Sequence, residues 1–320
     1  MAFLVGDGLT RSQMRMRRSW IALIVLFLAA CADDWPRPPA VARAQFASDF
    51  DAWRADRRER LLRPGSGPVI WVGLYEIPAG ASELGSDSSL AIVLPSPSVP
   101  RRIGTLRRTE NAVQFEPAPN ANVRLADSSV VKTPISLADD RGDSATVLAT
   151  GSLRMRVHGE PGTDRLWLRV WDVQHPARAT FTLPASYDPD TGWRFMARLE
   201  RFPQAREYRV PDIAGGSQVF HAPGELEFRV GRSRLRLTPF ADTGSRDYFV
   251  MLWDSTALST TYEAGRYLHV PFPDSTGWTV IDFNRAYNPP CVFSAYSTCA
   301  LPPRENRLPI AITAGEKRAK

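Results

Sequence analysis

The chain has 320 residues, 43% of them hydrophobic and 23% charged, so it holds enough apolar material for one large domain or two small ones and is not disordered by composition. The formal net charge is +6, but residues 1–30 hold four Arg against one Asp, which leaves +3 on residues 31–320. The remaining Arg residues are scattered rather than gathered on one stripe, which argues against nucleic acid as a partner.

The first thirty residues have the anatomy of a signal peptide. The stretch MRMRRSWIALIVLFLAAC has a basic start, an apolar run from Trp20 to Ala30, and small residues before Cys31. That run rises only about 16 Å as a helix, roughly half of a hydrocarbon core, so a permanent spanning helix is the poorer interpretation. The run ends in LAAC, which resembles the bacterial lipobox, in which the Cys is lipidated and becomes the first mature residue. The alternative is a short buried helix with a chance Cys.

These features predict a signal peptide at residues 1–30 and lipidation of Cys31. The mature protein would then be a lipoprotein of the cell envelope, anchored to the membrane by its lipid and facing the periplasm. Residues 31–45 are acidic and then rich in proline, as expected of a flexible linker. Within residues 46–64, apolar positions recur at helical intervals and end at Pro64-Gly65, which predicts one amphipathic helix.

The body beyond Gly65 has a dominant period of two, and its 27 Pro and 21 Gly break it into short segments. We predict a mainly β fold of short antiparallel strands in one or two packed modules, sandwich-like or barrel-like, with a first module at 65–173 and a second at 174–320. The clearest unit is ELEFRVGRSRLRL, which predicts a hairpin turning at Gly231-Arg232, with its Arg residues paired outward with Glu225 and Glu227.

The stretch from Val69 to Val173 resembles a forkhead-associated β-sandwich. Such modules read phosphothreonine with a Ser and a His in a loop, and the comparable loop here, VPRRIGTL, has neither. We therefore favour a β module with a purely structural role.

Polar side chains concentrate in the last seventy residues, around DFNRAYNPPC at 282–291. On a strand from Trp278 to Phe283, the side chain of Asp282 shares a face with Trp278 and Val280, which we expect to be the packed side. A buried carboxylate needs hydrogen-bond donors. Asn284, Tyr287 and Asn288 follow at once and can supply them.

DFNRAYNPPC, ENRL and AGEK, with YEAGRYL upstream, closely resemble the carboxy-terminal signature of the bacterial and archaeal domain-of-unknown-function family numbered 1684. The likeness extends from about Phe50 to Lys317 and is specific from Tyr248 onward. The resemblance implies membership and carries no established activity. Two departures are Leu252-Trp253-Asp254, where relatives often read Phe-Arg-Asp, and Cys299-Ala300-Leu301, where they read Cys-Pro-Leu. The first puts in doubt any anion site built on that missing Arg.

Lipidation of Cys31 would leave Cys291 and Cys299, an even pair in an oxidising compartment, and we favour a disulfide between them. Zinc ligation is less favoured, because the spacing is wrong for a zinc knuckle and no His lies in the same segment. A nucleophilic thiol would need a base nearby.

Two hypotheses follow for function. In the first, the terminal cluster is structural or binds a small polar ligand; it is supported by the absence of a nucleophile elbow, phosphate loop or helical His pair, and it implies no cofactor and no metal. In the second, a hydrolase uses Asp282 and Glu305 as acid and base, with Arg266, Arg307 or Lys317 holding an anionic group. The candidate ligand-binding residues are Arg266, Tyr267, Asn284, Tyr287, Asn288, Asn306, Arg307, Glu316 and Lys317.

Overall fold

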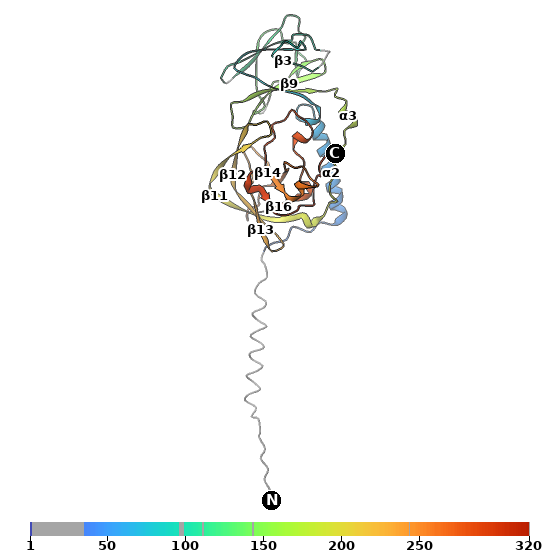
Figure 1. Cartoon of the computed structure of the whole chain (residues 1–320), viewed down its shortest axis with the longest axis vertical. Helices are drawn as coiled ribbons and strands as arrows, with labels where there is room; N and C mark the ends of the chain where they lie inside the picture. Colours follow the sequence, from blue (N-terminus) through green and yellow to red (C-terminus); the bar gives the residue numbers. More distant parts are fainter. Residues whose placement is uncertain (2–34, 96–98, 111, 143, 243, 320) are drawn as a thin grey trace. The chain divides into compact units, whose positions relative to one another are not determined.

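The computed structural model describes Met1 and residues 35–95, 99–110, 112–142, 144–242 and 244–319 (Figure 1). The predicted signal peptide beyond Met1 and the predicted lipidation site, Cys31, lie outside these residues. Residues 38–320 form one compact unit. Within the described ranges, no helix has both the length and the apolar character that crossing a bilayer requires.

The predicted amphipathic helix is present as α2 (Arg43–Leu62). Its buried side chains include Phe46, Phe50 and Leu61, as the helical spacing indicates. The helix ends because Pro64 follows: a residue before proline is pushed out of the α region, and Arg63 is extended at φ −65°, ψ 130°. A second, single-turn helix, α3 (Ala177–Thr180), lies between the two β regions along the chain.

The first β region is a sandwich of two sheets. One has the order β1-β10-β9-β8-β6 and the other β3-β2-β4-β5-β7. Their bounds are β1 (Trp71–Glu76), β2 (Gly80–Gly85), β3 (Ile92–Val93), β4 (Gly104–Arg108), β5 (Val113–Pro117), β6 (Arg124–Leu125), β7 (Ile135–Leu137), β8 (Leu148–Thr150), β9 (Leu153–Gly159) and β10 (Leu166–Asp172). Both sheets contribute to one apolar core that holds Phe115, Met155 and Leu168. The alternating strands predicted at 153–158 and 166–171 are present, with the odd positions of β9 buried.

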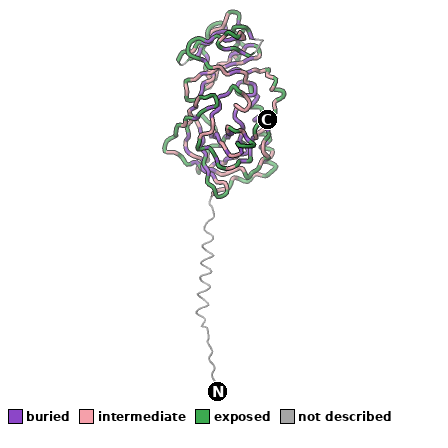
Figure 2. Tube along the Cα trace, viewed as in Figure 1, coloured by how far each residue is buried: buried purple, intermediate pink, exposed green. Residues whose placement is uncertain are grey.

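The second β region has two sheets and is built on two long strands. A four-stranded sheet has the order β13-β12-β11-β16, and a three-stranded sheet has the order β15-β14-β17. The bounds are β11 (Arg194–Pro211), β12 (Ser217–Val230), β13 (Ser233–Leu237), β14 (Asp247–Asp254), β15 (Arg266–Pro271), β16 (Trp278–Asp282) and β17 (Arg307–Leu308). Phe228, Val250 and Ile281 belong to the core between these sheets, and buried residues are purple in Figure 2. The predicted mainly β class is therefore confirmed.

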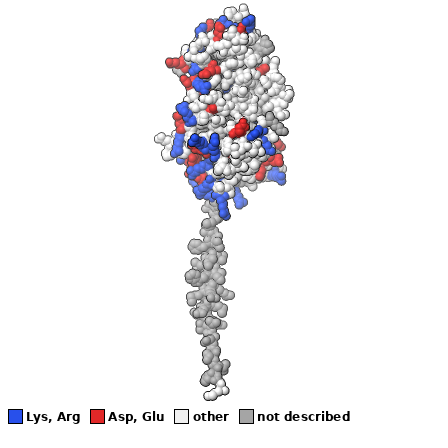
Figure 3. All heavy atoms as spheres, in the orientation of Figure 1, with Lys and Arg blue, Asp and Glu red and all other residues white. Residues whose placement is uncertain are grey.

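The predicted hairpin is β12–β13, and it turns at Gly231, whose φ of +60° suits a two-residue turn. Its Arg residues pair outward as expected: Arg236 contacts both Glu225 and Glu227 at 3.0 Å. Figure 3 shows Lys and Arg side chains interleaved with Asp and Glu on this part of the surface. Glu225 and Glu227 thus compensate part of the positive charge of the hairpin.

The prediction that Asp282 lies on the packed face of β16 is wrong. The buried residues of the strand are Thr279 and Ile281, and Asp282 alternates with them on the partly exposed side. Antiparallel pairing with β11 fixes this phase, because Ile281 lies opposite Phe195 and packs into the core. Thr279 tolerates burial because its hydroxyl donates to the carbonyl of Pro271 at 2.8 Å.

Candidate functional site

The carboxy-terminal signature is tied to helix α2 by a buried ion pair. The carboxylate of Glu316 is fully buried, and it accepts from Arg57 Nε at 3.1 Å and from the backbone N–H of Asn288 at 2.7 Å. Arg57 also donates to the carbonyl of Asn288 at 2.7 Å, and the amide of Asn288 donates to the carbonyl of Lys317 at 2.8 Å. Lys317 Nζ lies over the ring of Tyr187 at 4.6 Å. Three of the predicted residues therefore meet here, but in a closed network.

A second buried pair joins the end of β14 to the start of β15. Arg266 donates to Asp254 Oδ2 at 2.8 Å, and both side chains are almost completely buried. The same guanidinium donates to the carbonyl oxygens of Ala314 and Ile312 in the terminal segment. The Nε–H of Arg266 has no hydrogen-bond partner among the described residues, but the side chain is only 1% exposed. No N–H of Arg266 therefore reaches an open site that would hold a ligand, and its surroundings assign it a structural role.

The two remaining amides also bind backbone. Asn306 donates to the carbonyls of Thr238 and Met251 at 2.9 and 2.8 Å, which connects β13 to β14. Asn284 exchanges hydrogen bonds with the backbone of Asp190 and donates to Asp282 Oδ1 at 2.8 Å. Of the three residues predicted to supply donors to Asp282, Asn284 does so, whereas Tyr287 bonds to His269 and Asn288 bonds to Glu316 and Lys317.

The proposed acid and base do not share a cavity. Asp282 caps the short 3-10 helix Phe283–Arg285 by accepting from the Asn284 N–H at 3.1 Å. Glu305 lies exposed in the 3-10 helix Arg304–Asn306, and Arg307 is exposed over the ring of Trp253 at 5.6 Å.

The predicted disulfide is wrong for this structure. Cys291 and Cys299 are free, with their sulfurs 3.4 Å apart, far beyond a bond of about 2.05 Å. The backbone N–H of Cys291 instead donates to Cys299 Sγ at 3.1 Å. The hydrogen bond between the two thiols lowers the pKa of Cys291 and, together with burial, raises the pKa of Cys299.

An open cavity of about 660 Å³ lies beside the Arg57–Glu316 pair, and we call it the α2 cavity. One wall is the carboxy-terminal part of α2 and the turn after it; the other is β14, β15 and the signature. The lining residues are Trp53, Arg57, Arg60, Leu61, Arg63, Ser66, Pro68, Asp247, Phe249, Tyr267, His269, Pro271, Arg285, Tyr287 and Pro290. Of the residues predicted to bind a ligand, only Tyr267 and Tyr287 line it.

The α2 cavity is strongly cationic. Four guanidinium groups, from Arg57, Arg60, Arg63 and Arg285, line it with a single carboxylate, that of Asp247. Sequence reasoning missed all of them, although a signal was present: Trp53, Arg57 and Arg60 are spaced four and three apart, which places them on one helix face. Arg285 lies inside the motif DFNRAYNPPC at residues 282–291.

A chain of three polar side chains crosses one wall of the cavity. Asp247 Oδ1 lies 2.9 Å from His269 Nδ1, and His269 Nε2 lies 2.9 Å from the hydroxyl of Tyr287. If Nδ1–H donates to the carboxylate, Nε2 is left as the acceptor for the tyrosine O–H. Burial raises the pKa of Tyr287, although the guanidinium of Arg57, 4.4 Å from its ring, acts in the opposite direction. The phenol therefore keeps its proton at neutral pH.

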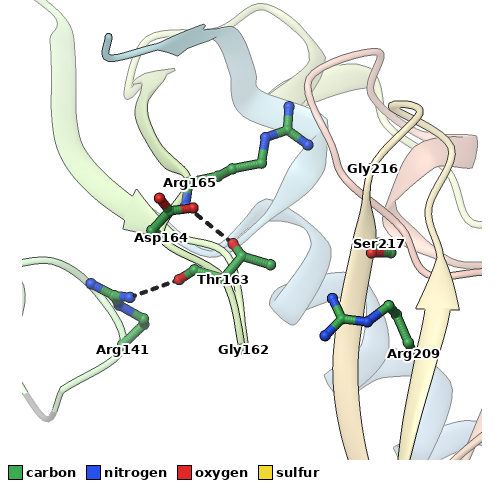
Figure 4. Close-up of a pocket in the computed structure, with 8 residues that line it drawn as sticks. All are labelled: Arg141, Gly162, Thr163, Asp164, Arg165, Arg209, Gly216 and Ser217. Carbon is green, nitrogen blue, oxygen red and sulfur yellow. Dashed lines mark hydrogen bonds between the residues drawn. The ribbon is translucent and has the colours of Figure 1, made fainter. Parts of the chain in front are cut away.

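A second hollow, of about 780 Å³, lies between the β9–β10 turn and strands β11 and β12 (Figure 4). Two of its three Arg residues are already engaged: Arg141 donates to the carbonyl of Thr163 at 3.2 Å, and Arg165 lies 3.4 Å from Glu160, whereas Arg209 has only a long contact, 3.7 Å, to Glu207. With one loosely paired cation and a lining carboxylate, Asp164, the hollow is less suited to an anion than the α2 cavity. Among the described residues, no group of three His, Cys, Asp or Glu side chains could hold a metal ion.

The family model described as "Protein of unknown function (DUF1684)" matches residues 179–317. Over these residues the chain belongs to the DUF1684 family. The resemblance inferred from the signature is confirmed, but the match begins at Ala179 rather than near Phe50. Eight of the fifteen residues that line the α2 cavity belong to the DUF1684 segment, and the other seven, from Trp53 to Pro68, lie outside that segment.

The solved structures that are similar to parts of the chain include the following three. An uncharacterised protein of Haloarcula marismortui, solved by NMR, has 30% identity over 44% of this chain and 78% of its own, with a TM-score of 0.37. The FHA domain of the CT664 protein of Chlamydia trachomatis has 19% identity over 30% of this chain and 92% of its own, with a TM-score of 0.21.

The third is Mycobacterium tuberculosis EmbR in complex with a low-affinity phosphopeptide, with 12% identity over 42% of this chain and 32% of its own, and a TM-score of 0.21. No curated protein sequence gives a significant match. At these TM-scores the three structures give no information on the α2 cavity.

Proposed function

We propose that the DUF1684 segment and helix α2 together bind a small organic anion in the α2 cavity. One observation carries the proposal: four guanidinium groups surround a cavity whose single carboxylate, Asp247, is already paired with His269. A ligand carboxylate or phosphate would receive charge-assisted hydrogen bonds there.

The positive charge of the cavity is only partly compensated by its neighbours. Arg57 pairs with Glu316, and Arg60 pairs with Asp56 at 2.6 Å. Arg285 has only a long contact to Asp282, at 3.8 Å, and Arg63 has no ion pair with any described carboxylate. Arg63 and Arg285 are therefore the two groups most available to an anion.

The rest of the lining favours a ligand with a flat apolar part. Trp53, Phe249, Tyr267 and Tyr287 present aromatic surface, and a volume of about 660 Å³ falls within the range of small-molecule pockets. The hydroxyl of Tyr287 supplies a polar contact at a fixed position, because His269 holds it. Aromatic carboxylates and aryl phosphomonoesters are the ligand classes that combine these features.

The test is a thermal-shift screen of the purified chain against these two classes, with titration calorimetry of every compound that raises the melting temperature. Replacing Arg63 or Arg285 with Gln should weaken binding about tenfold each, the usual effect of one lost charge-assisted hydrogen bond. Arg232→Gln, at the exposed turn of the β12–β13 hairpin, is the matched control and should leave affinity unchanged. A screen without any stabilising anion, or equal losses in the control, would reject the proposal.

The Asp247–His269–Tyr287 chain favours a second candidate, proton transfer to or from the bound anion. Tyr287 would touch the substrate, and His269, which is half exposed, would exchange the proton with solvent. In this form a hydrolase would not depend on Asp282 or Glu305, neither of which lines the cavity. If a bound compound is turned over, Tyr287→Phe should abolish turnover and leave its binding within about threefold, since a single neutral hydrogen bond contributes only modestly.

We also propose that the chain is exported and anchored by a lipid on Cys31, facing the periplasm. The support is the sequence at residues 14–31: a basic start, an apolar run and the LAAC ending. Expressed in a bacterium with lipoprotein processing, the chain should fractionate with membranes, and globomycin should cause the uncleaved precursor to accumulate. Cys31→Ser should abolish the lipid-dependent mass increase. Unchanged processing in that variant would contradict the anchor.

A further inference from the structure

A separate cavity of about 360 Å³ lies on the first β region, outside the segment that matches the DUF1684 family. It is bounded by the outer face of the β10-β9-β8-β6 sheet and by Pro64-Gly65 of the turn after α2. Its polar lining includes Arg124, Arg154, Arg156 and Trp171, and we call it the Arg–Trp cavity.

Strand register explains why these side chains meet. Trp171 lies opposite Arg154, Arg154 lies opposite Ala149, and Ala149 lies opposite Arg124, so one cross-strand row spans β10, β9, β8 and β6. Directly opposed residues share a face of the sheet, with their Cβ atoms about 5 Å apart. Ala149 is the small member of the row and leaves a gap between the two guanidinium groups. Arg156, two positions along β9, lies on the same face.

The two arginines on either side of the gap are positioned by backbone carbonyls rather than by acids. Arg124 Nη1 donates to the carbonyl of Ser128 at 2.8 Å, and Arg154 Nη1 donates to the carbonyls of Gly151 and Leu153 at 3.0 and 2.9 Å. Neither pairs with a carboxylate within the described residues, and no acidic residue lines the cavity. Arg156, in contrast, is neutralised by Asp140 at 3.0 Å. Two positive charges therefore face the gap without a counter-charge.

A buried donor at the same place also lacks an acceptor. Trp171 is only 3% exposed, lines the cavity, and its indole Nε1–H has no hydrogen-bond partner among the described residues. A buried unpaired N–H is costly, and such groups normally have a partner. An oxyanion in the cavity would provide an acceptor for it as well as a counter-charge for Arg124 and Arg154.

We infer that the Arg–Trp cavity is a second binding site, which takes one small oxyanion, a phosphate or a compact phosphomonoester, between Arg124 and Arg154. A volume of about 360 Å³ is near the lower limit for ligand pockets, so the body attached to the oxyanion must be small. The inference is independent of the α2 cavity, because the two cavities share no lining residue.

The experiment is calorimetric titration of the purified full chain with inorganic phosphate and, separately, with methyl phosphate, which lacks the aromatic part expected of an α2-cavity ligand. Wild type and an Arg63→Gln/Arg285→Gln variant should bind at least one of them equally well, and a tighter response to methyl phosphate would identify an organic phosphomonoester as the ligand class. Arg124→Gln and Arg154→Gln should each weaken binding about tenfold and more when combined. Both side chains are at least partly exposed, so the variants should fold, and thermal unfolding checks this.

Two further variants control the interpretation. Arg101→Gln removes an exposed arginine of the same β region, paired with Asp87, and should leave phosphate binding unchanged. Trp171→Phe keeps the ring but removes the N–H, and should lower affinity severalfold and abolish any ligand-induced change in tryptophan fluorescence. Absence of binding to either probe up to about 10 mM, or equal affinity in the Arg124→Gln/Arg154→Gln double variant, would overturn the inference.

Discussion

Glu160 is a buried acid whose surroundings disfavour its charge. Its side chain is fully buried, neither carboxylate oxygen has a hydrogen-bond partner among the described residues, and the nearest cation, Arg165, is 3.4 Å away. Burial raises the pKa of this carboxyl, and the nearby charge of Asp212 adds to the effect, while Arg165 opposes it. Arg165, the partner of Glu160, lines the hollow of Figure 4.

This raised pKa predicts a stability that falls as the pH rises. Below the ordinary glutamate pKa both folded and unfolded chains carry the proton, and above it the folded chain must give up a proton that it holds more tightly than the unfolded chain. Glu160→Gln mimics the neutral acid, so the variant should match wild type near pH 4 and be more stable at pH 8, by an amount on the order of 1 kcal/mol. Urea unfolding across this pH range measures the difference, and a wild type that is the more stable of the two at pH 8 would contradict it.

Arg266 tests whether the terminal signature is a structural network. Removing one member of a buried ion pair leaves the other charged and unpaired, so Arg266→Leu should destabilise the fold by about 3–5 kcal/mol. Arg307→Ala, an exposed neighbour over Trp253, should cost less than about 1 kcal/mol. Denaturant unfolding of the two variants compares them directly. Similar losses in the two variants would mean that the buried Arg266–Asp254 pair adds no more to the free energy of unfolding than an exposed arginine does.

At the scale of elements, the strand that carries His269 is flanked by two glycines in left-handed conformations. Gly265, before β15, has φ +101°, and a Cβ there would lie 2.6 Å from both the Leu252 carbonyl oxygen and Pro302 Cγ. Gly277, before β16, has φ +85° and open space around it. Comparing alanine variants at these two glycines therefore separates the cost of backbone strain from the cost of steric crowding.

Gly277→Ala should cost about 1–2 kcal/mol, the strain of a left-handed residue alone. Gly265→Ala should cost about 1–3 kcal/mol more, because the added methyl group must displace backbone and the double-proline segment. Thermal unfolding of both variants measures this difference. Equal losses would show that the segment around Pro302 yields without cost.

Sequence predicted the elements well wherever one face of a segment is packed and the other solvated. The helix α2, strands β9 and β10, and the β12–β13 hairpin all have that character, and each is present. The prediction failed at β16, where Trp278 and Val280 alternate with Thr279 and Ile281. With apolar residues in both phases, the pairing partner decides which face is buried, and the sequence of a single strand does not contain that information.

At the scale of the whole molecule, the candidate site depends on contacts between distant parts of the chain. Arg57 and Glu316 are separated by 259 residues, and His269 meets Tyr287 only because β15 bridges the signature segment. Two residues of the signature, Tyr267 and Tyr287, line the α2 cavity, but most of its polar residues serve to hold the chain ends together. Local motifs thus located the region, whereas tertiary packing selected which side chains face the cavity.

The short turn after α2 lies between the two proposed binding sites. Arg63, Ser66 and Pro68 line the α2 cavity, while Pro64 and Gly65 line the Arg–Trp cavity. A ligand that shifts this turn from one side changes the shape available on the other, so occupancy of the two cavities should be linked.

Titrations in both orders measure the linkage: phosphate should change the affinity of an α2-cavity anion, and that anion should change the affinity of phosphate by the same factor, at least about fivefold. Equal affinities with and without the other compound would show that the turn does not couple the two cavities. With the linkage present, six residues of backbone would let this protein respond to a combination of two solutes rather than to either one alone.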